Sequence, residues 1–276
     1  MNSRTVVHTG FTATGAGTGR ITAVSPLEIG IVLAWSFLVS FAGGMVGLVL
    51  GNLRLPVVIW VGSSVAAASG ANVAISGAAA ITAATVHWRN GRLDPRLFLW
   101  MAPSSFLGAV GGGLLSDLLP ERLLMGAIAL VVLYGAVEVW RYRRPAGTPI
   151  GAGPRRGGLI VEAVLIGFGI GMLGGFVGLI LGSLRLPAML KYMGIPPGRA
   201  VGTNSAVGVV VGIGGLIGHL PGGIDWEIFL AGAAAAMPAA WLGARFTGRL
   251  SERALLTAMA AVLVATGLAL AAQAIA

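Results

Sequence analysis

Residues 43–56 read GGMVGLVLGNLRLP, and residues 174–187 read GGFVGLILGSLRLP. The two segments are identical at 11 of 14 positions, with an offset of 131 residues. Chance does not produce this similarity, so the pair indicates an internal duplication. The correspondence continues outside the pair, because SGANVA at 69–74 resembles VGTNSA at 201–206. We infer that the chain from about residue 27 onward is a tandem duplication.

The composition excludes an ordinary water-soluble fold. Hydrophobic residues make up 56% of the 276 positions and charged residues only 10%, against roughly 25% charged residues in soluble domains. A helix that crosses a bilayer needs about 20 apolar residues. The sequence therefore predicts an all-α integral membrane protein surrounded by a lipid bilayer. Six runs contain no Asp, Glu, Lys or Arg: residues 29–53, 55–88, 97–116, 163–184, 200–224 and 254–276.

The chain divides into four parts. The linker contains five arginines, and basic loops favour the cytoplasmic side of a membrane. The first residues lack a continuous apolar core, so we do not expect a cleaved signal peptide. The predicted parts are a flexible N-terminal tail at 1–26, a first transmembrane repeat at 27–140, a basic cytoplasmic linker at 141–157 and a second transmembrane repeat at 158–276.

The loops indicate how the two repeats are oriented. The loop at 89–96 is basic, whereas its counterpart at 219–227 carries only acidic formal charge. Equivalent loops that prefer opposite sides are expected if the repeats are inverted in the membrane. Inversion needs an odd number of crossings, about five, with a short extra crossing within 55–88 and within 186–218. If the short element only dips in and returns, each repeat has four crossings and the repeats are parallel; we favour inversion.

Each copy of the quoted segment predicts a break in a long helix. Glycine allows close approach and backbone freedom at the end of the first helix. Pro56 and Pro187 cannot continue a helix from upstream, but they fit the first turn of a new one. A helix that starts inside the protein presents free N–H groups and a partial positive charge, which suits an anion. The glycines of the two breaks are Gly43, Gly44, Gly47, Gly51, Gly174, Gly175, Gly178 and Gly182.

One arginine accompanies each break. Arg54 and Arg185 lie two residues before the prolines, and a guanidinium suits an oxyanion. Burying this charge at the membrane centre costs at least about 2.5 kcal/mol, so it should face a partner or a watery path. The alternative is that both arginines reach the two interfaces and only fix the topology. Asn52 and Ser183, just upstream, could cap the new helix or touch substrate.

Other polar residues stand in the same apolar runs. Asn72 matches Asn204, which has Thr203 and Ser205 beside it. Polar groups in a membrane need partners, so hydrogen bonds between helices are one explanation. The functional alternative is that these side chains line one cavity from both repeats.

The sequence also limits the chemistry. His87 and His219 end apolar runs beside loops, so they could carry protons or have an interfacial structural role. The chain contains no cysteine, no HExxH zinc motif and no phosphate-binding GxxxxGK[ST] motif. We therefore expect no enzymatic activity, no cofactor, no bound metal and no nucleic-acid partner.

The duplicated segments resemble the TauE/SafE family of membrane permeases, also called sulfite exporters. The resemblance rests on 174–187, on AVGTNS at 200–205 and on GIDW at 223–226. Membership implies export or uptake of sulfite, sulfonates or related organic anions across the bacterial inner membrane. The family commonly has a run of glycines where this chain reads LGNLRL and LGSLRL, so the arginines distinguish this chain.

These observations predict a multi-pass secondary transporter that exports a small anion, sulfite or another sulfur oxyanion or organosulfonate. The candidate substrate-binding residues are Arg54, Arg185, Asn52, Ser183, Asn72, Asn204, Thr203 and Ser205. A passive anion channel and a non-transporting membrane scaffold are the alternatives. The sequence leaves open the coupling ion, proton or sodium, and the existence of a homodimer.

Overall fold

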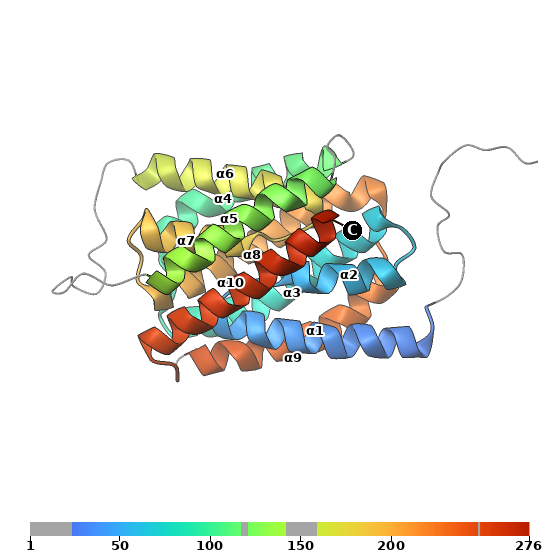
Figure 1. The fold of residues 1–276 in the computed structure, drawn as a ribbon, viewed down its shortest axis with the longest axis horizontal. Coiled ribbons are helices and arrows are strands. Elements are labelled where there is room, and N and C mark those ends of the chain that lie inside the picture. The colour runs from blue at the N-terminus through green and yellow to red at the C-terminus, as the bar shows by residue number, and fades with distance from the viewer. Residues whose placement is uncertain (1–23, 117–120, 142–158, 248, 276) are drawn as a thin grey trace, which may run out of the picture.

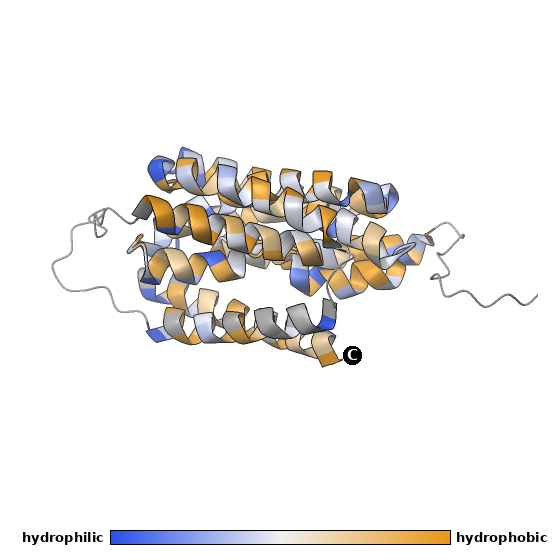
Figure 2. Cartoon of the chain, turned by 90° about the horizontal axis from the view of Figure 1, so that it is seen from above, coloured by the Kyte–Doolittle hydropathy of each residue, from blue (hydrophilic) through white to orange (hydrophobic). Residues whose placement is uncertain are grey.

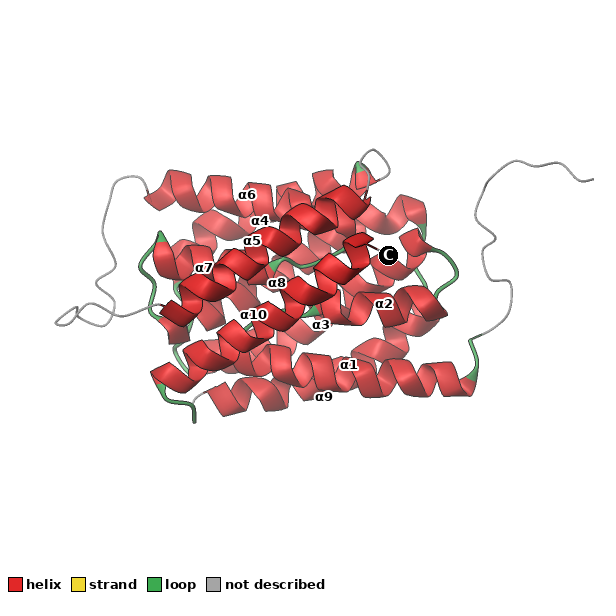
Figure 3. Ribbon diagram, viewed as in Figure 1, coloured by secondary structure: helices red, strands yellow, loops and turns green. Residues whose placement is uncertain are grey.

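The computed structural model confirms the predicted all-α architecture. It describes residues 24–116, 121–141, 159–247 and 249–275. These residues form α-helices and one short 3-10 helix, and the described part contains no strand (Figure 3). The predicted N-terminal tail and basic linker lie outside the described residues, apart from a few residues at their edges.

Both repeats contain five α-helices in the same order. The first repeat comprises α1 (Pro26–Val46), α2 (Gly51–Val61), α3 (Val65–Arg89), α4 (Pro95–Leu114) and α5 (Glu121–Arg141). The second comprises α6 (Leu159–Val177), α7 (Gly182–Lys191), α8 (Pro197–His219), the 3-10 helix Leu220–Gly222, α9 (Trp226–Thr247) and α10 (Glu252–Ile275).

The predicted helix breaks are present in both repeats. α1 ends at Gly47, whose φ of 68° is left-handed, and the N–H of Leu48 donates to the carbonyl of Gly43 over 2.9 Å. α6 ends in the same way, with a φ of 65° at Gly178 and a 2.8 Å hydrogen bond from the N–H of Leu179 to the Gly174 carbonyl. This is the Schellman arrangement, in which a residue with positive φ closes a helix. Glycine is needed at these two positions because other residues adopt a positive φ at a cost.

The prolines do not begin the short helices, so that prediction was wrong. α2 begins at Gly51 and α7 at Gly182, which places Pro56 and Pro187 in the second turn. A proline there removes only the hydrogen bond to the carbonyl four residues earlier, at Asn52 or Ser183. The residues at the caps are Leu50 and Leu181. Asn52 and Ser183 therefore lie inside the first turn and do not cap it.

The two repeats meet at α3 and α8. A Cβ on Gly77 would lie 3.2 Å from the Cα of Gly212, and a Cβ on Gly215 would lie 2.6 Å from Val73. The contacting residue numbers rise in α3 as they fall in α8, so these equivalent helices run antiparallel. This direction is compatible with the predicted inversion of the repeats.

The outer helices also pair between repeats. α1 packs on α9 along one edge of the molecule, α4 packs on α6 along the opposite edge, and α5 packs on α10 (Figure 1). Glycines permit the close approach: Cβ atoms on Gly108 and Gly112 would meet the α6 backbone at Phe168 and Met172. Small residues serve this purpose in membrane helices. Each of these three helix pairs therefore joins one repeat to the other.

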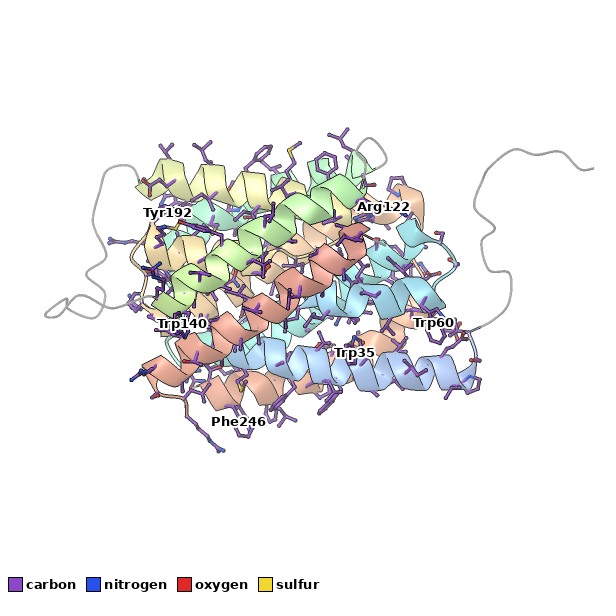
Figure 4. All side chains as sticks on the ribbon, viewed as in Figure 1. Trp35, Trp60, Arg122, Trp140, Tyr192 and Phe246 are labelled. Carbon is purple, nitrogen blue, oxygen red and sulfur yellow. The ribbon has the colours of Figure 1, made fainter. Side chains whose placement is uncertain are left out.

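The exterior suits lipid. Six described helices are long and apolar enough to cross a membrane, namely Pro26–Val46, Ala66–Arg89, Pro95–Leu114, Ile160–Val177, Pro197–Gly222 and Trp226–Thr247. Apolar residues run along the helices, with polar residues nearer their ends (Figure 2). Trp35, Trp60, Trp140 and Phe246 project from the outer surface (Figure 4). The chain is a multi-pass membrane protein.

Charge is distributed unevenly between the two ends of the bundle. α3, α5 and α9 end, and α6, α8 and α10 begin, at one end, where most described basic residues gather. The opposite end carries Glu28, Asp225 and Glu227, and its one described basic residue is Arg122. The positive-inside tendency predicts that the basic end is cytoplasmic. Its basic residues are Arg89, Arg92, Arg96, Arg141, Lys191, Arg199, Arg245, Arg249 and Arg253.

Cysteine labelling can test this orientation, because the chain contains no cysteine of its own. We expect Leu220→Cys to react with a membrane-impermeant maleimide added to intact spheroplasts, since Leu220 is exposed at the acidic end. Arg89→Cys, exposed at the basic end, should react only after permeabilisation. Labelling of both variants from the same side would contradict the inverted arrangement.

Candidate functional site

Each asparagine of the duplicated motif joins an arginine of its own repeat to the helix break of the other. The Oδ1 atom of Asn72 accepts a 3.0 Å hydrogen bond from Nε of Arg54. The Nδ2 atom of Asn72 donates over 3.3 Å to the carbonyl of Gly178. Asn72 is fully buried between α2, α3 and the second break. The amide of Asn72 thus accepts a hydrogen bond from its own repeat and donates one to the other repeat.

Asn204 repeats the pattern from the second half. Its Oδ1 accepts a 3.2 Å hydrogen bond from Nη1 of Arg185. Its Nδ2 donates over 2.7 Å to the carbonyl of Gly47 and over 3.3 Å to that of Gly182. The structure therefore brings together both arginines, both asparagines and both breaks through hydrogen bonds between helices, which is the first explanation that the sequence analysis gave for the asparagines. That these side chains line a substrate cavity stays a prediction.

Both guanidinium groups are buried inside the protein. Arg54 is 2% exposed and Arg185 is 0% exposed. These arginines therefore do not extend to the membrane interfaces, which was the alternative in the sequence analysis. No Asp or Glu pairs with either arginine in the part of the chain that the structure describes. Two buried cations without a counter-ion make the centre of the molecule strongly attractive to an anion.

The two arginines differ in how they are bonded. Nη2 of Arg54 donates to the hydroxyl of Ser76 and, over 3.2 Å, to the carbonyl of Asn72, and Nη1 donates over 3.4 Å to the hydroxyl of Ser40. All three nitrogens of Arg54 are thus occupied. In Arg185, Nε and Nη2 have no hydrogen-bond partner among the described residues.

The sequence explains this difference once the contacts are known. By the offsets of the repeats, Ser40 corresponds to Gly171 and Ser76 corresponds to Gly208. Both serines whose hydroxyl groups bond to Arg54 are therefore replaced by glycine at the equivalent positions of the second repeat. The sequence analysis did not single out Ser40 or Ser76. The signal that could have identified them is an alignment of the two repeats, in which each of these serines matches a glycine.

The short helices start at the same centre. Leu50 and Leu181 precede α2 and α7, and neither helix start has a side-chain cap. The first N–H groups of a helix lack partners within the helix and carry partial positive charge. The two helix starts add to the positive potential of the arginines.

A small cavity lies beside Arg54. It is lined by Ser40 and Ser76, by the first break and by residues of α3, α8 and α9, including Ser205 and Ala240. Its volume of about 20 Å³ is enough for a water molecule, which needs roughly 10–15 Å³. Ser205 lines this cavity, although its hydroxyl also donates to the Val201 carbonyl.

The remaining predicted residues lie in other places. Thr203 is buried, and its hydroxyl accepts a 2.9 Å hydrogen bond from the N–H of Asp94, so it holds the loop before α4. Asn52 and Ser183 are buried in the first turns of α2 and α7. Whether any of the predicted site residues touches substrate stays a prediction.

The two histidines are buried near the breaks rather than exposed at an interface. Nε2 of His219 lies 3.0 Å from the carbonyl of Gly175, which accepts its hydrogen bond. Nδ1 of His87 lies 3.5 Å from Nη1 of Arg92 in the loop after α3. Burial lowers the pKa of Arg92, although a guanidinium remains protonated in proteins. A role in proton coupling stays a prediction for both histidines.

Comparisons with known proteins agree with the architecture. A family model described as "Sulfite exporter TauE/SafE" matches residues 32–270. The chain is similar to "Probable membrane transporter protein YunE" of Bacillus subtilis (strain 168), with 31% identity over 109 residues. That match spans 38% of this chain and 38% of the relative, so it covers about two-fifths of the relative's length. No solved structure matches the chain.

Proposed function

The chain belongs to the TauE/SafE family of membrane transporters, and we propose that it is a secondary transporter that exports a small anion. The substrate class that the site favours is sulfite, another sulfur oxyanion or an organosulfonate. The membrane would be the inner membrane of a bacterium.

One observation carries the proposal: two buried arginines stand at the helix breaks without a carboxylate partner among the described residues. Leaving charged donors uncompensated costs several kcal/mol. An arginine with a purely structural role in a membrane normally pairs with an acidic residue or reaches the membrane interface. An oxyanion bound at the centre would supply the missing negative charge.

The distribution of charge supports export. The end predicted to be cytoplasmic carries nine described basic residues, from Arg89 to Arg253. A basic mouth raises the local concentration of anions and speeds their capture. The opposite end, with Glu28, Asp225 and Glu227, would favour release. We propose a proton or sodium ion as the coupling ion, and a homodimer remains part of the proposal.

The closed centre supports a carrier rather than a passive channel. The cavity at Arg54 has room for little more than a water molecule between the described residues, so this cavity is too small to act as an open anion pore. Broken helices from two repeats that meet at one site are typical of alternating access. The halves would move relative to each other along the glycine-lined contact of α3 with α8.

Flux measurements test this proposal directly. Purified protein in proteoliposomes should take up radiolabelled sulfite against its gradient when a proton or sodium gradient is imposed. Combined Arg54→Gln and Arg185→Gln substitutions should lower the rate at least about 100-fold, because each arginine contributes charged hydrogen bonds. Arg249→Gln, which removes an exposed charge, serves as the control.

Three outcomes would contradict the proposal. Flux that never exceeds the electrochemical driving force would indicate a passive channel. The absence of flux for sulfite, sulfate and taurine would indicate a scaffold or another substrate class. Unchanged flux in the double variant would exclude the arginines from the site.

A further inference from the structure

We propose that the anion binds to one arginine of the pair, Arg185, through the Nε and Nη2 edge of its guanidinium, and that Arg54 is a positioning residue. This inference rests on the proposed function and divides the roles of two residues that the duplicated sequence presents as equivalent. The ligand class is a compact oxyanion with at least two oxygens on one central atom.

The geometry of the guanidinium distinguishes its edges. The N–H of Nε and one N–H of Nη2 point in the same direction, which lets one arginine bind two oxygens of the same anion. In Arg54 this edge is filled by protein oxygens, from Asn72 and from the hydroxyl of Ser76. Arg54 therefore has no donor pair left for a ligand.

Arg185 is held differently. Its Nη1 donates to Oδ1 of Asn204 over 3.2 Å, which leaves the Nε and Nη2 edge as the part without a partner. The residue is 0% exposed, so bulk water does not serve these donors. Two buried N–H groups of a cation that point in one direction form a ready bidentate site for an oxyanion.

The first repeat shows where oxygen atoms belong around such an arginine. Ser40 and Ser76 place hydroxyl oxygens on the guanidinium of Arg54, and the second repeat has Gly171 and Gly208 at these positions. Of these two hydroxyl groups, only that of Ser76 lies on the Nε and Nη2 edge, because Ser40 accepts from Nη1. We infer that an oxygen of the anion takes, at Nη2 of Arg185, the place that the Ser76 hydroxyl has at Nη2 of Arg54. The start of α7 has no side-chain cap and lies three residues before Arg185 in the sequence, so it adds positive potential near this arginine.

The glycine at 208 permits a sharp test. A Cβ on Gly208 would lie 3.1 Å from Cγ2 of Val49 and 3.6 Å from Cβ of Ala80, so a small side chain needs only a slight adjustment there. Gly208→Ala and Gly208→Ser add the same Cβ, and only the serine adds an acceptor where Ser76 has one in the first repeat. The pair therefore separates the effect of the oxygen from that of bulk.

We expect Gly208→Ser to raise the KM for radiolabelled sulfite at least about tenfold over Gly208→Ala, because its hydroxyl competes for a charged donor. The alanine variant should stay within about threefold of the unsubstituted protein, since contacts at this distance relax cheaply. Equal KM values in the serine and alanine variants would overturn the proposal.

A second pair decides the matter if the serine variant fails to fold. Arg185→Lys keeps the charge and removes the two-donor edge, so it should raise the KM for sulfite at least about tenfold. Arg54→Lys should lower thermal stability, because it loses bonds to Ser40, Ser76 and Asn72, with a smaller change in KM. Added sulfite should raise the unfolding temperature of Arg54→Lys and not that of Arg185→Lys.

The reverse order of the two lysine variants, in KM and in stabilisation by sulfite, would overturn the assignment to Arg185. The failure of the proposed function gives a different result: the unsubstituted protein then shows neither sulfite flux nor stabilisation by sulfite. The two proposals are thereby tested separately by the same preparations.

Discussion

Substitution by alanine of Gly47 or Gly178, the two glycines of the breaks that have a positive φ, is expected to destabilise the protein strongly. Gly47 has a φ of 68°, and a Cβ on it would lie 2.7 Å from the Cα of Val201. Gly178 has a φ of 65°, and its Cβ would lie 3.2 Å from the Cα of Ser69. A left-handed residue other than glycine costs about 1–2 kcal/mol, and overlap with a helix backbone adds typically 1–3 kcal/mol or more. Together these contributions lead us to expect that each variant loses about 2–5 kcal/mol of stability.

The measurement is the yield of monodisperse protein by size-exclusion chromatography in detergent after stepwise heating. Two glycines provide matched controls. Gly91 also has a positive φ, 65°, but no atom lies within 4 Å of a Cβ at this position. Gly91→Ala should therefore lose only about 1–2 kcal/mol, which is what a left-handed backbone conformation costs alanine. Gly198→Ala has open space and no positive φ, and it should be neutral. If Gly47→Ala were as stable as Gly91→Ala, the contact with Val201 would not hold the repeats together.

These glycines also show what a sequence can predict. A positive φ has a chemical signature, because glycine adopts it at little cost. The duplicated glycines therefore predicted breaks at the correct place in both repeats. The lack of charge over long runs likewise predicted membrane helices, because lipid excludes charged side chains along the whole length of a span.

The start of the short helices was harder to predict. Proline is common in the first turn of a helix, and this preference led to a start near Pro56 and Pro187. In the structure the chain turns immediately after the breaks, and Gly51 and Gly182 already belong to the new helices. Close packing decides this point: a Cβ on Gly182 would lie 2.8 Å from Nδ2 of Asn204. Such contacts join residues that are far apart in the sequence, so the local sequence does not show them.

The candidate site was predicted only in part for the same reason. The repeated arginines and asparagines were visible as polar residues in apolar runs. Their different surroundings depend on Ser40 and Ser76, which lie on α1 and α3 and reach Arg54 only in the folded chain. A serine in a membrane helix usually bonds to its own backbone, so nothing in the local sequence marked these two. The differences between the repeats at Ser40 and Ser76 could be interpreted only after the structure showed that both serines bond to Arg54.

The second large effect is expected at Asn204. Its Oδ1 accepts from Arg185 and its Nδ2 donates to the carbonyl of Gly47. Asn204→Ala removes the described partner of a buried cation and frees a carbonyl at the opposite break. Each hydrogen bond to a charged group contributes about 1.5–3 kcal/mol. We therefore expect a loss of about 3 kcal/mol or more in the absence of substrate.

The matched variant is Asn72→Ala, which removes the equivalent amide from the first repeat. Arg54 then keeps the hydroxyl groups of Ser40 and Ser76 and the carbonyl of residue 72. The loss should therefore be smaller, by roughly the strength of one charged hydrogen bond. Heating both variants in sulfite-free detergent and measuring the soluble monomer compares them directly. A repeat whose arginine keeps three further acceptors should tolerate the change better than one whose arginine keeps none among the described residues. Equal losses would therefore mean that the hydroxyl groups of the first repeat do not compensate its arginine.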